Sequence, residues 1–296
     1  MKHIPVLLEE TISVLALRPD SVVVDATLGG GGHSRRILEE LDDRGVYIGI
    51  DADPAAIEAA DELHRYKATV HLINDNFSNL AKILGDLEVT PTAILADLGW
   101  RSDQFESSNK GFSFQKDEPL VMTFGDPEKH VFTASDVVND WSEESLADII
   151  YGFGEERASR RIARAIVAAR ENGEIKTSLQ LAGIIESAIP RFKGKSKIHP
   201  ATKTFQAIRI AVNAELQVLQ DLLSQGFDLL APSGRMAIIS FHSLEDRIVK
   251  QFFNEKIQAE QALKLIKKPI VATEEERATN PRSRSAKLRV IEKLSL

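Results

Sequence analysis

The sequence predicts an α/β fold, a doubly wound parallel sheet that is interrupted by a helical insertion. Short apolar runs alternate with helical patterns between residues 22 and 97, which is typical of parallel sheets with crossover helices. Four glycines, residues 29–32, follow the first apolar run, and acids (Asp25, Asp51 and Asp97) stand at the ends of three runs. Because parallel strands end at one edge, these features should meet at a ligand site.

The first part of the chain supplies four strands. Residues 2–17 have an amphipathic helical pattern, with Pro5 where a helix start tolerates proline. The β-branched run at 22–24 predicts a buried strand. Asp53 and Pro54 have the types preferred at the N-cap and first position of a helix. The predicted elements are a helix at 35–41, a strand at 46–50, a helix at 55–64, a strand at 68–73, a helix at 80–87 and a strand at 93–96.

The alternation stops after the fourth strand. Residues 101–129 are polar and aperiodic, and loops of such length are usually functional. Ser243 is the expected N-cap of a late helix, with Asp246 as its third residue. The later elements are helices at 134–150, 155–171, 178–189 and 205–223, a strand at 235–241, a helix at 243–254 and a strand at 287–293. We therefore expect residues 1–108 and 206–296 to form the core and residues 109–205 to form the insertion.

Composition narrows the class of protein. The chain has 296 residues, 43% of them hydrophobic, which is enough for a large buried core. It has no cysteine, so disulfides, thiolate metal sites and a cysteine nucleophile are excluded. No grouping of His, Asp and Glu has metal-ligand spacing, so we expect no metal. Acids within the N-terminal apolar stretch argue against a signal peptide or a membrane span, so we expect a cytoplasmic protein.

Positive charge is concentrated in two segments, although the formal net charge is −7. Residues 191–209 hold six basic side chains and no acid, and residues 280–293 hold five basic side chains against Glu292 alone. Two basic segments on an acidic body indicate a local polyanion site. Ordinary solvated loop charge is the alternative.

The glycine turn indicates a nucleotide-like ligand. A strand, a glycine turn and a helix start bring backbone N–H groups against a polar ligand. Asp51 follows the glycines by roughly 20 residues, the spacing at which a carboxylate binds ribose hydroxyls. A dinucleotide-dependent oxidoreductase is one alternative, but no clean G-x-G-x-x-G follows the strand. An ordinary flexible turn is another.

Several longer motifs carry a resemblance to a known family. They are HIPVL (3–7), DATLGGGGHS (25–34), GIDADP (49–54), DLG (97–99), GFSF (111–114), GEERASRRIARAIV (154–167), HPATKTFQAIRIAVN (199–213), SFHSLEDR (240–247) and NPRSRSAK (280–287). In this order they resemble the bacterial 16S ribosomal RNA cytosine-N4 methyltransferases. The resemblance implies an S-adenosylmethionine-dependent enzyme with a Rossmann-like core, which methylates N4 of one cytidine in the decoding region of 16S rRNA in the small ribosomal subunit.

The resemblance also implies the cofactor residues. They are Gly31, Gly32, His33, Asp51, Phe77, Asp97 and Gln104. We expect His33 to contribute its backbone and Asp51 to accept both ribose hydroxyls. Phe77 would lie against adenine, with plain core packing as the alternative. Asp97 and Gln104 would lie near the sulfonium.

Two residues are candidates for the chemistry. Asp97 and His242 follow neighbouring strand ends, and we expect them to line the cytosine pocket as catalytic residues. His242 would accept the proton that N4 loses. The alternative is a histidine that caps the following helix.

The chain departs from the family pattern after DLG and after GFSF. Trp100-Arg101-Ser102 replaces Val-Ser-Ser, and Pro-Leu-Val-Met-Thr at 119–123 lacks the usual Asp and Arg. A non-catalytic RNA-binding or ribosome-assembly protein is therefore an alternative function. Apolar faces on the inserted helices would also allow a homodimer.

Overall fold

The protein is described by a computed structural model that covers residues 4–98, 109–189 and 199–295. They divide into a sheet unit, residues 1–101 and 216–296, and a helical unit, residues 102–215. Gln104, residues 100–102 and the basic residues at 191–197 lie outside the described ranges. No helix within the described ranges is both long and apolar enough to cross a membrane.

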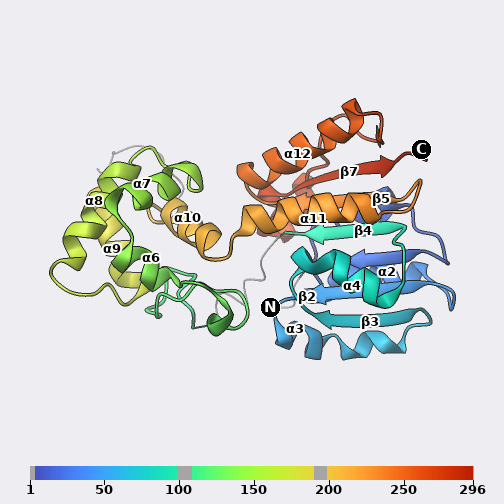
Figure 1. The fold of residues 1–296 in the computed structure, drawn as a ribbon, viewed down its shortest axis with the longest axis horizontal. Helices are drawn as coiled ribbons and strands as arrows, with labels where there is room; N and C mark the ends of the chain where they lie inside the picture. Colours follow the sequence, from blue (N-terminus) through green and yellow to red (C-terminus); the bar gives the residue numbers. More distant parts are fainter. Residues whose placement is uncertain (1–3, 99–108, 190–198, 296) are drawn as a thin grey trace. The chain divides into compact units, whose positions relative to one another are not determined.

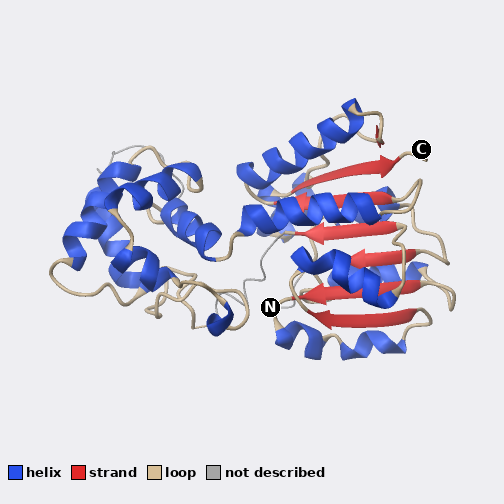
Figure 2. Ribbon diagram, viewed as in Figure 1, coloured by secondary structure: helices blue, strands red, loops and turns tan. Residues whose placement is uncertain are grey.

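The described strands form one sheet in the order β3-β2-β1-β4-β5-β7-β6 (Figures 1 and 2). Neighbours from β3 to β5 run parallel, whereas β7 is antiparallel to both β5 and β6. The bounds are β1 Val22–Asp25, β2 Val46–Asp51, β3 Thr69–Asn74, β4 Ala93–Asp97, β5 Arg235–Ser240, β6 Ala262–Lys264 and β7 Lys287–Lys293. The predicted α/β sheet is confirmed.

Register explains why the strand ends coincide. Asp25 of β1 pairs with Gly49 of β2 and with Leu95 of β4, so each neighbour ends two residues beyond Asp25. Asp97 pairs in turn with Ile239 of β5. The carboxyl ends of the five parallel strands therefore lie along one edge.

Helices cover both faces of the sheet. One face packs on α1 (Leu8–Leu15), α2 (Gly32–Glu40) and the short helix η1 (Asp61–Arg65). The other packs on α4 (Leu80–Leu87), α11 (Glu215–Leu229) and α12 (Ser243–Gln258), which lie in front of the strands in Figure 1. This double cover accounts for the continuous apolar runs in β1 and β4, which are buried on both sides.

The predicted first helix is shorter than its pattern. α1 begins at Leu8, because Leu7 adopts a left-handed conformation (φ 53°, ψ 40°) that excludes Pro5 and Val6 from the helix. α3 (Pro54–Ala59) begins as predicted, since Asp53 caps it by accepting from the Ala55 N–H at 3.0 Å. It stops at Ala59, and η1 covers the rest of the predicted helix 55–64.

The helical unit contains α6 (Ala134–Asp140), α7 (Glu143–Gly152), α8 (Ser159–Arg170), α9 (Ser178–Ala188) and α10 (Thr202–Val212), after a short helix η3 (Pro127–Lys129). They share one apolar core. The predicted helix 134–150 is two helices, because Ser142 caps α7 by accepting from the Ser145 N–H at 3.1 Å. α10 packs against α6 and α7.

The predicted helix 205–223 is also wrong as a single element. α10 ends at Val212 and α11 starts at Glu215, with Ala214 left-handed (φ 49°) between them. Asn213 uses its side chain on another segment: Oδ1 accepts from the Phe124 N–H at 2.7 Å, and Nδ2 donates to the Met122 carbonyl at 2.8 Å.

The C-terminal part adds elements that the sequence did not predict. α13 (Glu274–Thr279) and the short helix η4 (Pro281–Ser285) precede β7, and β6 follows α12. Lys287 and Arg289 of β7 hold the Asp246 carboxylate at 2.9 and 2.7 Å. Lys293 donates to two backbone carbonyls. Lys287, Arg289 and Lys293 of this basic segment are therefore engaged within the protein.

Candidate active site at the carboxyl edge of the sheet

The glycine turn joins β1 to α2 at this edge. Gly29 and Gly31 have positive φ angles of 50° and 68°, which glycine adopts without the strain of a side chain. Gly32 opens α2, and a Cβ atom there would meet the Pro5 ring at 2.9 Å. Glycine is therefore required at Gly29 and Gly31 by the backbone conformation and at Gly32 by the contact with Pro5.

Asp51 ends β2 directly beside this turn. Its Oδ2 accepts from the Gly29 N–H at 2.8 Å and its Oδ1 accepts from the Asp53 N–H at 2.9 Å. Burial raises the pKa of Asp51, although these two N–H groups oppose the increase. A carboxylate has about four acceptor positions, so two remain for hydroxyl donors.

Asp25 lies beneath the turn and is only 1% exposed. Its Oδ2 accepts from Ser34 Oγ at 2.9 Å and from the Tyr47 hydroxyl at 3.1 Å, and its Oδ1 accepts from the Thr27 N–H at 3.2 Å. Burial raises its pKa despite these bonds and the nearby His33. Asp25 therefore supports the turn from inside and does not face the edge.

The side chain of His33 lies between the N-terminal segment and the end of β4. The buried ring places Nε2 3.0 Å from the Val6 carbonyl oxygen and Nδ1 3.7 Å from Asp97 Oδ2. Asp97 is fixed through its own backbone, since its N–H donates to Thr27 Oγ1 at 2.6 Å. The end of β4 is thus joined to the turn after β1.

Phe77 follows β3 in the short helix η2 (Phe77–Asn79). Its ring is partly buried against the core on the α4 side of the sheet. Asn74, at the end of β3, donates from Nδ2 to the Asp51 carbonyl at 2.9 Å. The predicted aromatic residue therefore stands two strands from β1, on the side where Asp51 lies.

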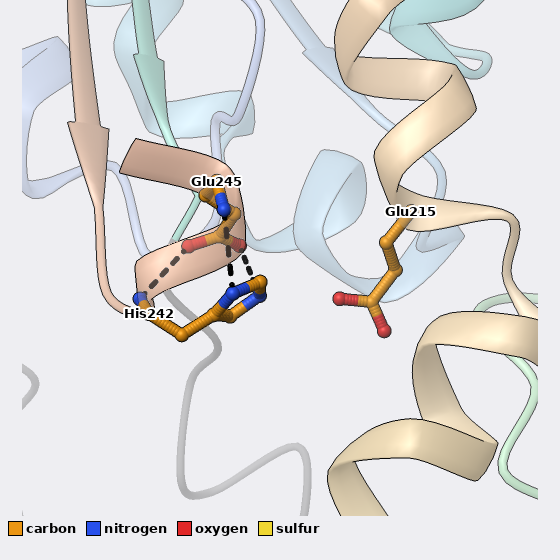
Figure 3. A group of neighbouring side chains, drawn as sticks. All are labelled: Glu215, His242 and Glu245. Carbon is orange, nitrogen blue, oxygen red and sulfur yellow. Dashed lines mark hydrogen bonds and ion pairs between the residues drawn. The ribbon is translucent and has the colours of Figure 1, made fainter. Parts of the chain in front are cut away.

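His242 is the N-cap of α12, and the predicted cap Ser243 is wrong (Figure 3). His242 Nδ1 accepts from the Glu245 N–H at 3.4 Å, while Glu245 Oε2 accepts from the N–H groups of Phe241 at 2.8 Å and His242 at 3.2 Å. The imidazole therefore accepts from the backbone N–H of the third helical residue, Glu245, which is the role that a serine or aspartate side chain has in most N-caps. This capping box was the alternative considered for His242.

The imidazole tautomer follows from the cap. Because Nδ1 accepts, the ring proton is on Nε2, which lies 3.0 Å from Glu245 Oε1 but is not aligned for a hydrogen bond among the described residues. The electron pair of Nδ1, the ring nitrogen that could accept a proton, is thus occupied by the Glu245 N–H of α12. His242 and Glu245 give two ligand atoms in the sheet unit, fewer than a structural zinc site needs. Figure 3 also draws Glu215, whose Oε1 accepts from Arg209 Nε at 2.7 Å.

Replacing His242 separates its two possible roles. His242→Ala should lower the free energy of unfolding by about 1 kcal/mol through loss of the cap, whereas His242→Asn, a good N-cap, should not. Urea unfolding measures this difference. S-adenosylhomocysteine affinity should be unchanged in both variants. Normal methyl transfer by His242→Asn would remove the predicted role as proton acceptor.

A family comparison shows to which family the chain belongs. The sequence profile described as the MraW methylase family matches residues 1–294. The chain belongs to the MraW methylase family. Curated relatives named ribosomal RNA small subunit methyltransferase H are 46% identical in Dehalococcoides mccartyi, covering 99% of this chain and 86% of the relative, and 46% identical in Clostridium botulinum (strain Loch Maree), covering 99% of both.

A solved rRNA methylase from Streptococcus thermophilus is 12% identical, with a TM-score of 0.46 and 99% of each chain covered. Within this MraW-family chain, the sheet edge brings together Gly31, Gly32, His33, Asp51 and Asp97, and Phe77 lies at the next strand end. Ser34 and Tyr47 were missed by the sequence analysis, because nothing local distinguishes them from core residues.

Proposed function

We propose that this chain is an S-adenosylmethionine-dependent methyltransferase that methylates N4 of one cytidine in the decoding region of 16S ribosomal RNA. The observation that carries the proposal is the buried Asp51 carboxylate beside a positive-φ glycine turn, in a chain that matches the MraW methylase family almost end to end. The small ribosomal subunit is its partner, and the cytoplasm is its place of action.

The residues at the edge fit the cofactor. Asp51 retains acceptor capacity for two ribose hydroxyls after its contacts with Gly29 and Asp53. The backbone at Gly31, Gly32 and His33 would hold the methionine part, and Phe77 would lie against adenine. Asp97 would hold the α-amino group or line the methyl position. Gln104 completes the proposed set outside the described residues.

The cofactor, when bound, supplies an electrophilic methyl group. The N4 electron pair of cytosine is delocalised into the ring, so the protein must align N4 with that group and accept the proton that N4 loses. Alignment contributes roughly 7–11 kcal/mol at best. Asp97, at the end of β4 and the centre of the edge, is the carboxylate best placed to accept this proton. The base must first be unstacked.

We propose that the helical unit contacts the RNA through α8. Arg160, Arg161 and Arg164 are exposed, and Arg164 follows Arg160 by four residues and Arg161 by three on one helix face. Two of them stand in the first turn, where the helix dipole disfavours positive charge. Glu143 Oε1 is 3.6 Å from Arg164 Nε, but that pair is exposed and contributes little. Since neither the helix dipole nor the exposed ion pair favours this cluster of positive charge, we propose an external polyanion as its partner.

Neutralising this face should weaken RNA binding. Changing Arg160, Arg161 and Arg164 to glutamine should lower affinity for 16S rRNA at least tenfold and reduce the salt slope of log K by roughly 2–3, since each phosphate contact adds about 0.9. Filter binding at several salt concentrations measures both. The control changes the exposed Lys82, Lys250 and Lys264, which removes equal charge from the sheet unit. Equal loss in both variants would contradict a specific α8 surface.

The earlier expectation for the basic loop is tested in the same way. Neutral residues at 193, 195 and 197 should also weaken RNA binding and flatten its salt dependence.

A homodimer is proposed on exposed apolar side chains of the helical unit, Val131 (97% exposed) and Tyr151 (65%). Sedimentation at several protein concentrations tests it.

Labelled methyl transfer tests the function directly. The protein is incubated with methyl-labelled S-adenosylmethionine and small subunits that lack the modification, and the label is then mapped. Label on one cytidine N4 supports the proposal. Cofactor binding without transfer would instead favour the non-catalytic RNA-binding alternative. A thermal shift with NAD(P), but none with S-adenosylmethionine, would favour the oxidoreductase.

A further inference from the structure

The N-terminal segment Ile4–Leu7 packs against the glycine turn and is hydrogen-bonded by residues near the C-terminus. The Pro5 ring packs on Gly32 so closely that a Cβ at Gly32 would be 2.9 Å away. From the far end of the chain, Asn280 Nδ2 donates to the Ile4 carbonyl at 3.1 Å. Glu276 Oε1 accepts from the Leu7 N–H at 2.8 Å. The segment is therefore a built part of this edge.

Leu7 adopts a conformation that leucine avoids. Its φ of 53° and ψ of 40° lie in the left-handed region, where the Cβ atom comes too close to the following carbonyl oxygen. Its side chain is fully buried, and its N–H is held by Glu276. Strain of this kind persists only where surrounding contacts enforce it. Here the enforced turn directs the preceding Val6 carbonyl to His33.

The Val6 carbonyl determines the tautomer of His33. A carbonyl oxygen only accepts, so the ring nitrogen 3.0 Å from it, Nε2, carries hydrogen. Nδ1 is then the nitrogen that faces Asp97, 3.7 Å from Oδ2, which is longer than a hydrogen bond but within the range of an electrostatic contact. Both side chains are mostly buried, His33 at 7% and Asp97 at 12% exposure, so water screens the contact weakly.

We propose that His33 is a positioning residue that orients the Asp97 carboxylate through its imidazole, and that Glu276, from the opposite end of the chain, fixes this imidazole through Leu7 and Val6. The inference deepens the proposed function, on which the role of Asp97 rests. The sequence predicts that only the backbone of His33 contacts the cofactor, whereas here its side chain also has a role, the orientation of Asp97.

Two variants of His33 dissect its contacts. Glutamine reaches the position of Nε2 and keeps a donor for the Val6 carbonyl, whereas asparagine reaches the position of Nδ1 and keeps a donor toward Asp97. We expect His33→Gln to keep the melting temperature but to bind S-adenosylhomocysteine about tenfold more weakly. His33→Asn loses the Val6 contact, so it should lose thermal stability and bind about threefold to tenfold more weakly, less of a loss than in His33→Gln. Calorimetric titration and thermal unfolding give the two readouts. Equal affinity in wild type and His33→Gln would overturn the proposal.

Glu276 provides a test remote from the cofactor. Glu276→Ala should increase the hydrogen-exchange rate of the Leu7 amide at least tenfold and weaken S-adenosylhomocysteine binding by about threefold to tenfold. The matched control is Glu275→Ala, because Glu275 is the exposed neighbour on the same helix. Faster Leu7 exchange with wild-type affinity would contradict the link between the two ends of the chain and the site.

The tautomer has a signature in the ligand-free protein. Nitrogen-15 spectra of the histidine rings should show His33 Nε2 protonated, and loss of one signal set in His33→Gln assigns it among the seven histidines. An unprotonated Nε2 would refute the arrangement. These results separate the two proposals: failure of wild type to bind S-adenosylhomocysteine or to methylate RNA counts against the proposed function, whereas wild-type behaviour of the variants counts against the role of His33.

Discussion

Replacing Asp51 with alanine is expected to weaken S-adenosylhomocysteine binding by about 100-fold. Two charge-assisted hydrogen bonds to ribose would be lost, and about 3 kcal/mol corresponds to this factor. Gly29 would also lose the acceptor of its N–H, which holds the glycine turn against β2. Calorimetric titration measures the change.

Asp51→Asn keeps one acceptor oxygen, so we expect a smaller loss, about tenfold. The control is Asp86→Asn, which removes a carboxylate from an exposed position on α4. Binding by Asp51→Ala within threefold of wild type would show that the ribose is held elsewhere.

The affinity should also depend on pH through the same side chain. Burial raises the pKa of Asp51, with the Asp53 and Gly29 N–H groups opposing the increase. Protonation therefore begins at a higher pH than for an ordinary aspartate, whose pKa is about 3.9. Since the protonated carboxyl has fewer acceptor sites, affinity should be full above the raised pKa and fall as pH decreases through it. Asp51→Asn should lack this dependence.

Gly154→Ala is expected to destabilise the helical unit by about 3 kcal/mol. A Cβ atom at Gly154 would stand 2.6 Å from the carbonyl oxygens of Ile150 and Lys203, and backbone oxygens cannot rotate away. The end of α7 and the start of α10 must then separate, which is a severe case of overpacking. Thermal unfolding should show the transition of the helical unit lowered by roughly 10 °C.

The sheet unit provides an internal reference for this variant. Affinity for S-adenosylhomocysteine should stay at the wild-type value, while RNA methylation falls with the folded fraction of the helical unit. Gly183→Ala is the matched control, because nothing lies within 4 Å of its added Cβ in α9. It should be neutral or stabilising by up to about 1 kcal/mol. A Gly154→Ala variant as stable as wild type would contradict the packing described.

The strands and the edge were predictable because the physics that determines them is local. The β-branched run at 22–24 and the apolar run at 93–96 are buried on both faces, and each ends in an acid. The glycine turn and Asp51 are likewise recognisable from spacing. The breaks near Trp141 and Ala214 were missed, because a long apolar periodicity continues across both.

The remaining features depend on residues far apart in the sequence. The imidazole of His33 acquires its contact from Val6, which is 27 residues away, and Leu7 is held by Glu276, which is 269 residues away. Asp25 looks from sequence like another ligand residue, yet Ser34 and Tyr47 enclose it. The sequence allowed two roles for His242, and the structure shows that its Nδ1 caps α12.

The pairing of β4 with β5 has a consequence for how the protein is made. β4 ends at Asp97 and β5 begins at Arg235, so the ribosome synthesises the entire helical unit between these two neighbours. At about 5–20 residues per second, the nascent chain carries the open, apolar flank of β4 for on the order of ten seconds. The helical unit is complete in sequence before the sheet can close, and it is therefore expected to fold first during translation.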